Sequence, residues 1–339
     1  MTTIKDVAEL AGVSISTVSR VLNGRTYVNE STRNMVMEAI RKTNYSPNAL
    51  AKSLKMGRSD TICLMVPSIE NPIFPEITKG VEDFARRSGF TVMLCNTDED
   101  VTLEKSYIDK MKTRQVDGFV VCSCMPYSEH IRRLYEEGMP MVLVNRFEEK
   151  DINKIDTVSV DNYQAAFEAT QYLIRLGRKR IALMLGREEL YLYQERYRGY
   201  CKALENNHIP YDEALVSQEA AGLGANSFYY ATQELMRLPN PPDAFFCTSD
   251  PKAFVVLHAL HEMGVQIPRD VAVMGFDNVH LSAMTEPPLS TISQRLHEMG
   301  GIAAKCLLHQ IEYKEKNGEL PPPVHTVMSW DLIVRRSTR

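Results

Sequence analysis

The sequence of 339 residues lacks several features that would place it in a familiar class of protein. It contains no run of about 18 or more apolar residues, so we expect no membrane-spanning helix. Its amino-terminal segment has no basic region followed by an apolar stretch, so we expect no secretory signal and a cytoplasmic protein. No nucleophile elbow, Walker loop or dinucleotide fingerprint occurs, which predicts neither an enzyme nor a bound cofactor.

Cysteine is sparse, with seven residues, and it forms no familiar ligand motif. Four of the seven lie within or at the end of apolar runs typical of buried strands: Cys63, Cys95, Cys122 and Cys247. The segment Cys122–Cys124 lacks the two-residue spacer of common zinc and redox motifs. His258 and His261 stand three apart on an expected helix, but no third ligand accompanies them. We therefore expect reduced thiols and no metal site.

Charge is unevenly distributed along the chain. The formal net charge is −4, which by itself argues against nucleic acid as a partner. Residues 1–58, however, carry nine Lys and Arg against four acidic residues, a net +5 that leaves −9 for the remainder. A small basic head on an acidic body is typical of a localised phosphate-binding surface.

The head is expected to contain three short helices. Thr3, Ser14 and Asn29 are plausible N-caps, and Gly12 can end the first helix in a left-handed conformation. Apolar residues at helical spacing would form its small core: Ile4, Val7, Ala8, Ala11, Val18, Val21, Leu22, Val36, Ala39 and Ile40. A tight turn between the first two helices is typical of the helix-turn-helix unit. Other three-helix domains share this periodicity, so the exposed chemistry has to distinguish them.

The exposed side of the expected second helix carries hydroxyls and Arg20, not the Glu/Lys mixture of a merely solvated face. An arginine at the groove floor can bind a guanine edge through two hydrogen bonds, while hydroxyls hold phosphates. These residue types predict a surface that reads DNA.

Several segments resemble the lactose/galactose repressor family of transcriptional regulators. They are Thr3-Ile4-Lys5-Asp6-Val7-Ala8, Ala11-Gly12-Val13-Ser14, Thr17-Val18-Ser19-Arg20-Val21-Leu22-Asn23 and Asn44-Tyr45-Ser46-Pro47-Asn48-Ala49-Leu50-Ala51. The resemblance extends over essentially the whole chain. It implies a helix-turn-helix domain over 1–46, a hinge over 47–59 and an effector-binding core over 60–339.

The resemblance also implies DNA contacts at particular positions. Ile15, Ser16 and Arg20 occupy the base-reading positions. Further contacts fall on Thr3, Ser14, Thr17, Ser19 and Asn23, and in the hinge on Asn48, Ala51 and Leu54. The hinge sequence predicts a helix of about two turns. An isolated helix of this length is only marginally stable in water, so the alternative is a flexible linker when the protein is not bound to DNA. On DNA, Leu54 is expected to wedge between base steps in the minor groove.

The core alternates strands and helices from Thr61 onward, which predicts parallel sheets with helices on both faces. A glycine stands before each of four expected strands: Gly89, Gly138, Gly177 and Gly264. The length fits two lobes, at about 60–160 plus 292–320 and at about 161–290 plus 321–339. The fold class is therefore α/β, a two-lobed core similar to periplasmic binding proteins, preceded by a small all-α domain. Ligands of such sheets bind beyond the carboxyl ends of the strands, here between the lobes.

The resemblance carries effector contacts onto Phe74, Arg196 and Asp277, and also onto Asn71, Arg146, Ser249 and Asp250. Asp250-Pro251 also reads as a helix cap, and Asn71-Pro72 as a turn. Arg196 is expected at the start of a helix. Asn145 and Ser249 depart from the family's usual Asp and Asn, which puts a standard hexose in doubt. Arg146, Arg187 and Arg196 together offer a place for a phosphate or carboxylate.

These features predict an allosteric repressor whose affinity for operator DNA is controlled by a small ligand, expected to be a carbohydrate. A single head touches few base pairs, so we expect a homodimer on a pseudo-palindromic double-stranded operator. The alternative is a regulator whose core responds mainly to a protein co-regulator.

Overall fold

The computed structural model describes residues 2–22, 28–45, 58–126, 128–220 and 226–339. The chain forms two compact units, Met1–Ser59 and Asp60–Arg339, which are described separately.

The smaller unit contains three helices, α1 (Ile4–Leu10), α2 (Ile15–Leu22) and α3 (Glu30–Thr43). The predicted caps are confirmed. Thr3 precedes α1, Ser14 Oγ accepts from the Thr17 N–H at 3.2 Å, and Asn29 Oδ1 accepts from the Thr32 N–H at 2.8 Å. Gly12 adopts φ +63°, the left-handed conformation that ends α1.

The core of this unit is small and entirely aliphatic. Its buried members are Val7, Ala8, Val18, Val21, Val36 and Ala39, all of which were predicted. Because each helix contributes two of them, no helix can bury its apolar face without the other two.

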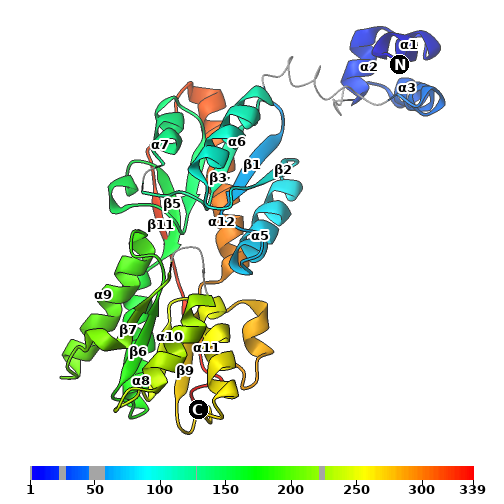
Figure 1. Cartoon of the computed structure of the whole chain (residues 1–339). Coiled ribbons are helices and arrows are strands. Elements are labelled where there is room, and N and C mark those ends of the chain that lie inside the picture. The colour runs from blue at the N-terminus through cyan, green and yellow to red at the C-terminus, as the bar shows by residue number, and fades with distance from the viewer. Residues whose placement is uncertain (1, 23–27, 46–57, 127, 221–225) are drawn as a thin grey trace. The chain divides into compact units, whose positions relative to one another are not determined.

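The larger unit contains two six-stranded sheets, one in each lobe (Figure 1). The first lobe contains β1 (Thr61–Val66), α5 (Ile73–Arg87), β2 (Thr91–Asn96), α6 (Val101–Thr113), β3 (Gly118–Val121), α7 (Glu129–Glu136), β4 (Met141–Val144), η1 (Glu149–Asp151), β5 (Asp156–Val160), α12 (Leu296–Asn317) and β11 (His325–Met328). The second contains α8 (Asn162–Arg175), β6 (Ile181–Leu185), α9 (Tyr191–Asn206), η2 (Glu213–Leu215), β7 (Val216–Gln218), α10 (Ser227–Met236), β8 (Ala244–Cys247), α11 (Asp250–Glu262), β9 (Ala272–Asp277), η4 (His280–Ala283), β10 (Ser290–Ser293) and β12 (Asp331–Ile333).

The strand orders are β11-β5-β4-β3-β1-β2 and β12-β10-β9-β8-β6-β7. Every neighbouring pair is parallel except β10 and β12. The carboxyl ends of the parallel strands therefore share one edge in each lobe, and three candidate residues lie in the loops that follow them: Asn71, Arg146 and Ser249.

Alternate residues of each central strand face opposite helix layers. In β1, Ile62 and Leu64 pack with α5 and α12, whereas Cys63 and Met65 pack with α6 and α7. The second sheet is covered in the same way by α8 and α9 on one face and α10 and α11 on the other. Burial on both faces explains why these strands read as continuous apolar runs.

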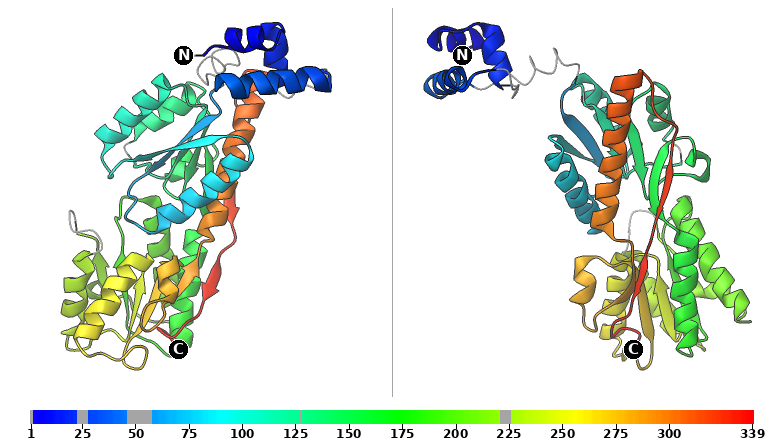
Figure 2. Two further views of the ribbon diagram at one scale, coloured as in Figure 1. Left: turned by 90° about the vertical axis from the view of Figure 1, so that its right-hand side faces the viewer. Right: turned by 180° about the vertical axis from the view of Figure 1, so that it is seen from behind.

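Three segments cross between the lobes, joining β5 to α8, β10 to α12 and β11 to β12 (Figure 2). This corrects the predicted lobe boundaries at two places. Residues 325–328 pair in parallel with β5 of the first lobe, although 321–339 was assigned to the second. Ser293 pairs with Asp277 in the second lobe, although 292–320 was assigned to the first. A strand of only three or four residues carries little pattern of its own, and it pairs with the sheet whose edge strand lacks a neighbour. The sequence does not indicate which of the two sheets that is.

None of the helices among the described residues combines the length and the apolar character that a membrane span requires.

Candidate functional site

Helix α2 presents polar side chains opposite its buried residues. Val18 is fully buried, whereas Ser16 and Arg20 are exposed and Ile15 exposes 44% of its surface. The exposed arginine can bind a guanine edge, and the exposed isoleucine offers an apolar surface that suits a thymine methyl group.

The hydroxyls at the start of α2 form a small network. Ser14 Oγ lies 2.7 Å from Ser16 Oγ and 2.9 Å from Thr17 Oγ1, so these side chains hold one another in place. Thr3 donates its hydroxyl and its backbone N–H to the Asp6 carboxylate at 3.0 and 2.7 Å. Ser19 stands half-buried on the same helix. The remaining predicted DNA contacts, Asn23, Asn48, Ala51 and Leu54, lie outside the described residues.

In the larger unit, Arg196 is one of the predicted ligand-binding residues, and its side chain is held by several contacts. It lies inside α9, not at its start as predicted, and only 1% of its surface is exposed. Its Nε donates to Asn162 Oδ1 at 2.9 Å, its Nη1 donates to the Thr248 carbonyl, and its guanidinium carbon lies 3.6 Å from the centroid of the Phe276 ring. These contacts fix the guanidinium plane at the carboxyl edge of the second sheet.

Asp277 ends β9 beside this arginine. Its Oδ1 lies 3.9 Å from Arg196 Nη1 and accepts a hydrogen bond from Gln294 Nε2 at 2.6 Å. The residue has φ +122°, a conformation that side chains rarely adopt and that often marks functional positions. Burial raises the pKa of Asp277 to about 6, although Arg196 and Lys252 counteract that effect.

Asp250 is fully buried, and its side chain makes hydrogen bonds within the protein. Its carboxylate accepts from the Val279 N–H at 3.0 Å, the Ser282 hydroxyl at 2.6 Å and the Thr291 hydroxyl at 2.6 Å. Burial and the neighbouring Asp277 raise the pKa of Asp250 to about 8. Because three protein donors already occupy its oxygens, the structure favours a structural role. The predicted cap is also corrected, since Ser249, not Asp250, is the N-cap of α11.

Ser249 accepts a hydrogen bond from a lysine that the sequence analysis did not single out. Lys252 Nζ lies 3.1 Å from Ser249 Oγ, 3.2 Å from Glu219 Oε2 and 4.9 Å from the centroid of the Tyr193 ring. Only 4% of Lys252 is exposed. The sequence gives no indication that Lys252 is buried, because a lysine in the first turn of a helix is usually exposed to solvent.

The first lobe contributes Phe74, in the first turn of α5, and Arg146, just after β4. The Arg146 guanidinium carbon lies 5.8 Å from the centroid of the Phe74 ring. Asn71, by contrast, accepts from the Ile73 N–H at 3.2 Å, which is the turn that the sequence offered as its alternative.

Glu99, in the loop after β2, connects Arg146 to the second lobe. Its carboxylate lies 2.7 Å from Arg146 Nη1 and 2.6 Å from Arg187 Nη1, and Arg187 follows β6. The three arginines grouped from the sequence are thus separated, because two pair with Glu99 and Arg196 pairs with Asp277.

The buried polar atoms that have no hydrogen-bond partner within the described part of the chain include Arg196 Nη2, Asn145 Oδ1 and Gln294 Oε1. Each of these three belongs to a residue at the carboxyl edge of a sheet. Met125, which follows β3, packs with Tyr193 of the second lobe, whose ring lies 5.5 Å from the Arg196 guanidinium. We define the interlobe site by six residues, Phe74, Asn145, Arg146, Arg196, Asp277 and Gln294.

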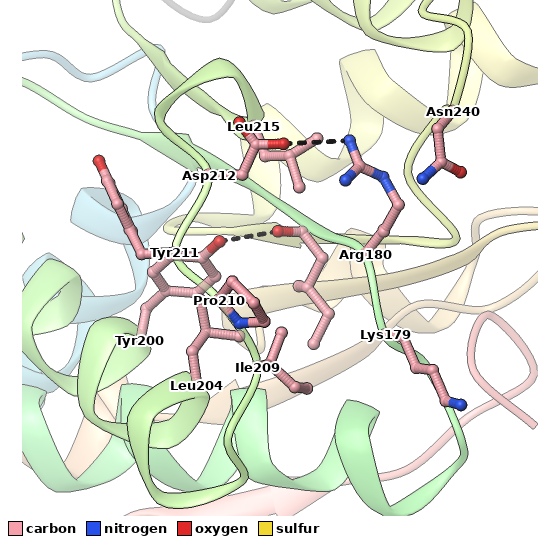
Figure 3. A pocket seen from close by; sticks show the side chains of 11 residues that line it. Lys179, Arg180, Tyr200, Leu204, Ile209, Pro210, Tyr211, Asp212, Leu215 and Asn240 are labelled. Carbon is pink, nitrogen blue, oxygen red and sulfur yellow. Dashed lines mark hydrogen bonds and ion pairs between the residues drawn. The ribbon is translucent and has the colours of Figure 1, made fainter.

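A different pocket, of about 390 Å³, lies in the second lobe (Figure 3). Its walls include Tyr200 and the Arg180–Asp212 ion pair, in which Nη2 and Oδ2 are 3.2 Å apart. It also contains Ile181, the first residue of β6, and therefore lies at the opposite end of this strand from Arg187. The predicted ligand-binding residues do not line it.

All seven cysteines are free thiols. Among the described residues, no group of three His, Cys, Asp or Glu side chains could hold a metal ion.

Comparison with known proteins gives matches over nearly the whole chain. Residues 3–48 match the family model of bacterial regulatory proteins of the lacI family, and residues 59–325 match that of periplasmic binding proteins and the sugar-binding domain of the LacI family. The HTH-type transcriptional regulator RegA of Clostridium acetobutylicum is 39% identical over 99% of both chains. The HTH-type transcriptional repressor CytR of Escherichia coli K12 is 36% identical over 99% of this chain and 96% of that one. A structure of the transcriptional regulator CelR in complex with cellobiose superposes with a TM-score of 0.74 at 32% identity, covering 99% of this chain and 100% of that one. The chain belongs to the lacI family of bacterial regulatory proteins, which are DNA-binding transcriptional regulators controlled by small molecules.

Proposed function

We propose that this regulator is a cytoplasmic, non-enzymatic repressor that binds a pseudo-palindromic operator as a homodimer and responds to an uncharged polyhydroxylated effector, a sugar or sugar derivative, in the interlobe site. The similarity to the repressor CytR supports repression as the mode of regulation. The match to the sugar-binding domain model and the similarity to CelR, whose structure was solved with cellobiose, support a sugar as the effector.

The observation that carries the effector assignment is the set of three buried atoms without partners. Arg196 Nη2 is a donor, whereas Asn145 Oδ1 and Gln294 Oε1 are acceptors. Leaving such atoms unpaired costs about 1–3 kcal/mol each, so a ligand that satisfies them gains that energy on binding. Hydroxyl groups both donate and accept, so a polyhydroxylated ligand can satisfy all three atoms.

The site also suggests how binding reaches the DNA. A ligand that contacts Asn145 in the first lobe and Arg196 in the second stabilises one relative orientation of the lobes. The first lobe begins at β1, directly after the segment that joins it to the head. A shift in lobe orientation would thereby change how the two heads of a dimer are presented to the two half-sites.

The homodimer rests on the geometry of DNA recognition, because two-fold operators mirror two-fold proteins.

The test is a thermal-shift screen of the full chain against neutral sugars, sugar derivatives and nucleosides, followed by operator binding with each hit. The variant Asn145→Gly removes one acceptor. Glycine adopts the observed φ of +64° without strain, so the backbone should keep its conformation. The variant should weaken binding of the hit about tenfold while leaving operator binding without ligand unchanged. If no compound shifts the transition, a protein co-regulator becomes the better hypothesis.

A further inference from the structure

The Glu99 carboxylate lies between two guanidiniums at the carboxyl edges of both sheets. One oxygen lies 2.7 Å from Arg146 Nη1 and the other 2.6 Å from Arg187 Nη1. Burial disfavours the charged carboxylate, but Arg146 and then Arg187 outweigh that effect and hold the pKa of Glu99 below its usual range. Glu99 is therefore an anion already bound at two arginines beside the interlobe site.

The other charges around the site are also paired. Arg196 lies against Asp277 and Lys252 against Glu219, while Arg187 has Glu189 as a second partner. Each cation named here thus has a carboxylate within 4 Å. An incoming phosphate or carboxylate would meet satisfied cations and several negative charges.

We infer that Glu99 determines the charge specificity of the interlobe site: it occupies the anion position formed by Arg146 and Arg187 and so restricts the site to uncharged effectors. This inference rests on the proposed function, because it specifies the ligand class of the same site.

The physical reason is competition within one molecule. A carboxylate attached to the loop after β2 acts at a high effective concentration, so a free anion must displace it and then remain near it. The displaced carboxylate would lose two charge-assisted hydrogen bonds, which are stronger than neutral ones. A neutral hydroxyl ligand suffers neither loss.

A simpler role for Glu99 would be a tie between the lobes. In that case its removal would change the affinity for neutral and anionic ligands in the same proportion. Charge specificity predicts a change for anions alone, so paired ligands separate the two roles.

The experiment compares the full chain with Glu99→Gln, which keeps the size of the side chain and removes its charge. The matched control is Asp98→Asn, which removes one charge from the same loop, where Asp98 accepts from Asn96. Calorimetry and thermal shift use inorganic phosphate and two ligand pairs, ribose with ribose 5-phosphate and glucose with glucose 6-phosphate.

Glu99→Gln should raise affinity for phosphate and for the phosphorylated member of at least one pair by about tenfold or more, with little change for neutral sugars. The unmodified chain and Asp98→Asn should prefer the neutral members or bind no anion. The inference is overturned if Glu99→Gln gains no affinity for any anion, or if the unmodified chain already prefers the phosphorylated sugar. If the gain appears while no neutral compound binds, the charge specificity stands and the sugar assignment fails.

Discussion

The guanidinium of Arg196 stacks on the ring of Phe276, with its carbon 3.6 Å from the ring centroid, and both residues are buried in the second lobe. Stacking fixes the plane of the guanidinium, and the hydrogen bonds to Asn162 and Thr248 fix its rotation within that plane. The free Nη2 is consequently held in one direction before any ligand arrives. Such preorganisation lowers the entropy that a ligand loses on binding.

The variant Arg196→Lys tests this arrangement. Lysine keeps the charge beside Asp277 but has neither the planar stack nor the forked donors, so effector affinity should fall about tenfold to a hundredfold. The unfolding free energy should fall by about 1–3 kcal/mol, because the Asn162 and Thr248 acceptors lose their donor. Calorimetry and urea unfolding measure the two effects. Arg198→Lys on the same helix, where Arg198 pairs with Glu195 at the surface, is the control and should change neither.

A second prediction concerns pH and the pair Asp250 and Asp277. Burial raises the pKa of both carboxyl groups, to about 8 and about 6, above the unfolded value of about 3.9. The folded chain therefore binds protons more tightly than the unfolded chain at these groups. Their contribution to the unfolding free energy is favourable at low pH and falls as pH rises from about 4 to about 8.

Asp250→Asn should remove the upper part of that decline. The amide oxygen can still accept from Val279 and Ser282, and the amide nitrogen can donate to Thr291 Oγ1, so the fold is retained. Urea unfolding of both proteins at about pH 5, 6, 7 and 8 gives the difference between them, which isolates this group from all others. The variant should gain stability relative to the unmodified chain steadily as pH rises from about 5 to about 8, because the contribution of Asp250 declines over that whole range. A constant difference across the range would contradict the raised pKa of Asp250.

The sequence predicted the helix-turn-helix unit and most of the α/β core because both follow from periodicity and caps. Thr3, Ser14 and Asn29 act locally, so their roles can be read within four residues. The lobe boundary failed at β11, a short strand that joins whichever sheet edge is free.

The residues of the candidate site differ in the same way in whether local sequence pattern could predict them. Arg196 and Asp277 came from family resemblance, and the structure places them 3.9 Å apart. Gln294 directly follows β10 and could have been found by the rule that selects residues after strands. The pairing of Glu99 with Arg187 joins residues 88 positions apart in different lobes, and no local pattern encodes such a contact.

A third prediction concerns the crossing of α5 and α12. A Cβ at Gly300 would lie 2.1 Å from the Ile77 carbonyl oxygen, so Gly300→Ala must push the helices apart. The neighbouring Gly301 has its nearest atom, the Gly80 oxygen, at 3.8 Å. Gly300→Ala should lower the unfolding free energy by about 1–3 kcal/mol, whereas Gly301→Ala should leave it unchanged or raise it by up to about 1 kcal/mol. Equal unfolding midpoints for the two variants would show that the crossing tolerates the extra carbon.

The last prediction addresses the head, where Arg20 stands exposed on α2 beside Ser16. An arginine that reads a base edge contributes about 1–3 kcal/mol of discrimination, whereas one that only neutralises phosphates weakens binding to all sequences alike. Arg20→Ala should therefore lower operator affinity about tenfold to a hundredfold and reduce the ratio of operator to random-sequence binding. Arg41→Ala, on α3, removes the same charge from an exposed position and should preserve that ratio. Fluorescence anisotropy with operator and scrambled duplexes at several salt concentrations measures both quantities. If the two variants lose operator affinity equally and keep the same ratio, Arg20 acts as a phosphate contact and the base-reading role belongs to other residues of α2.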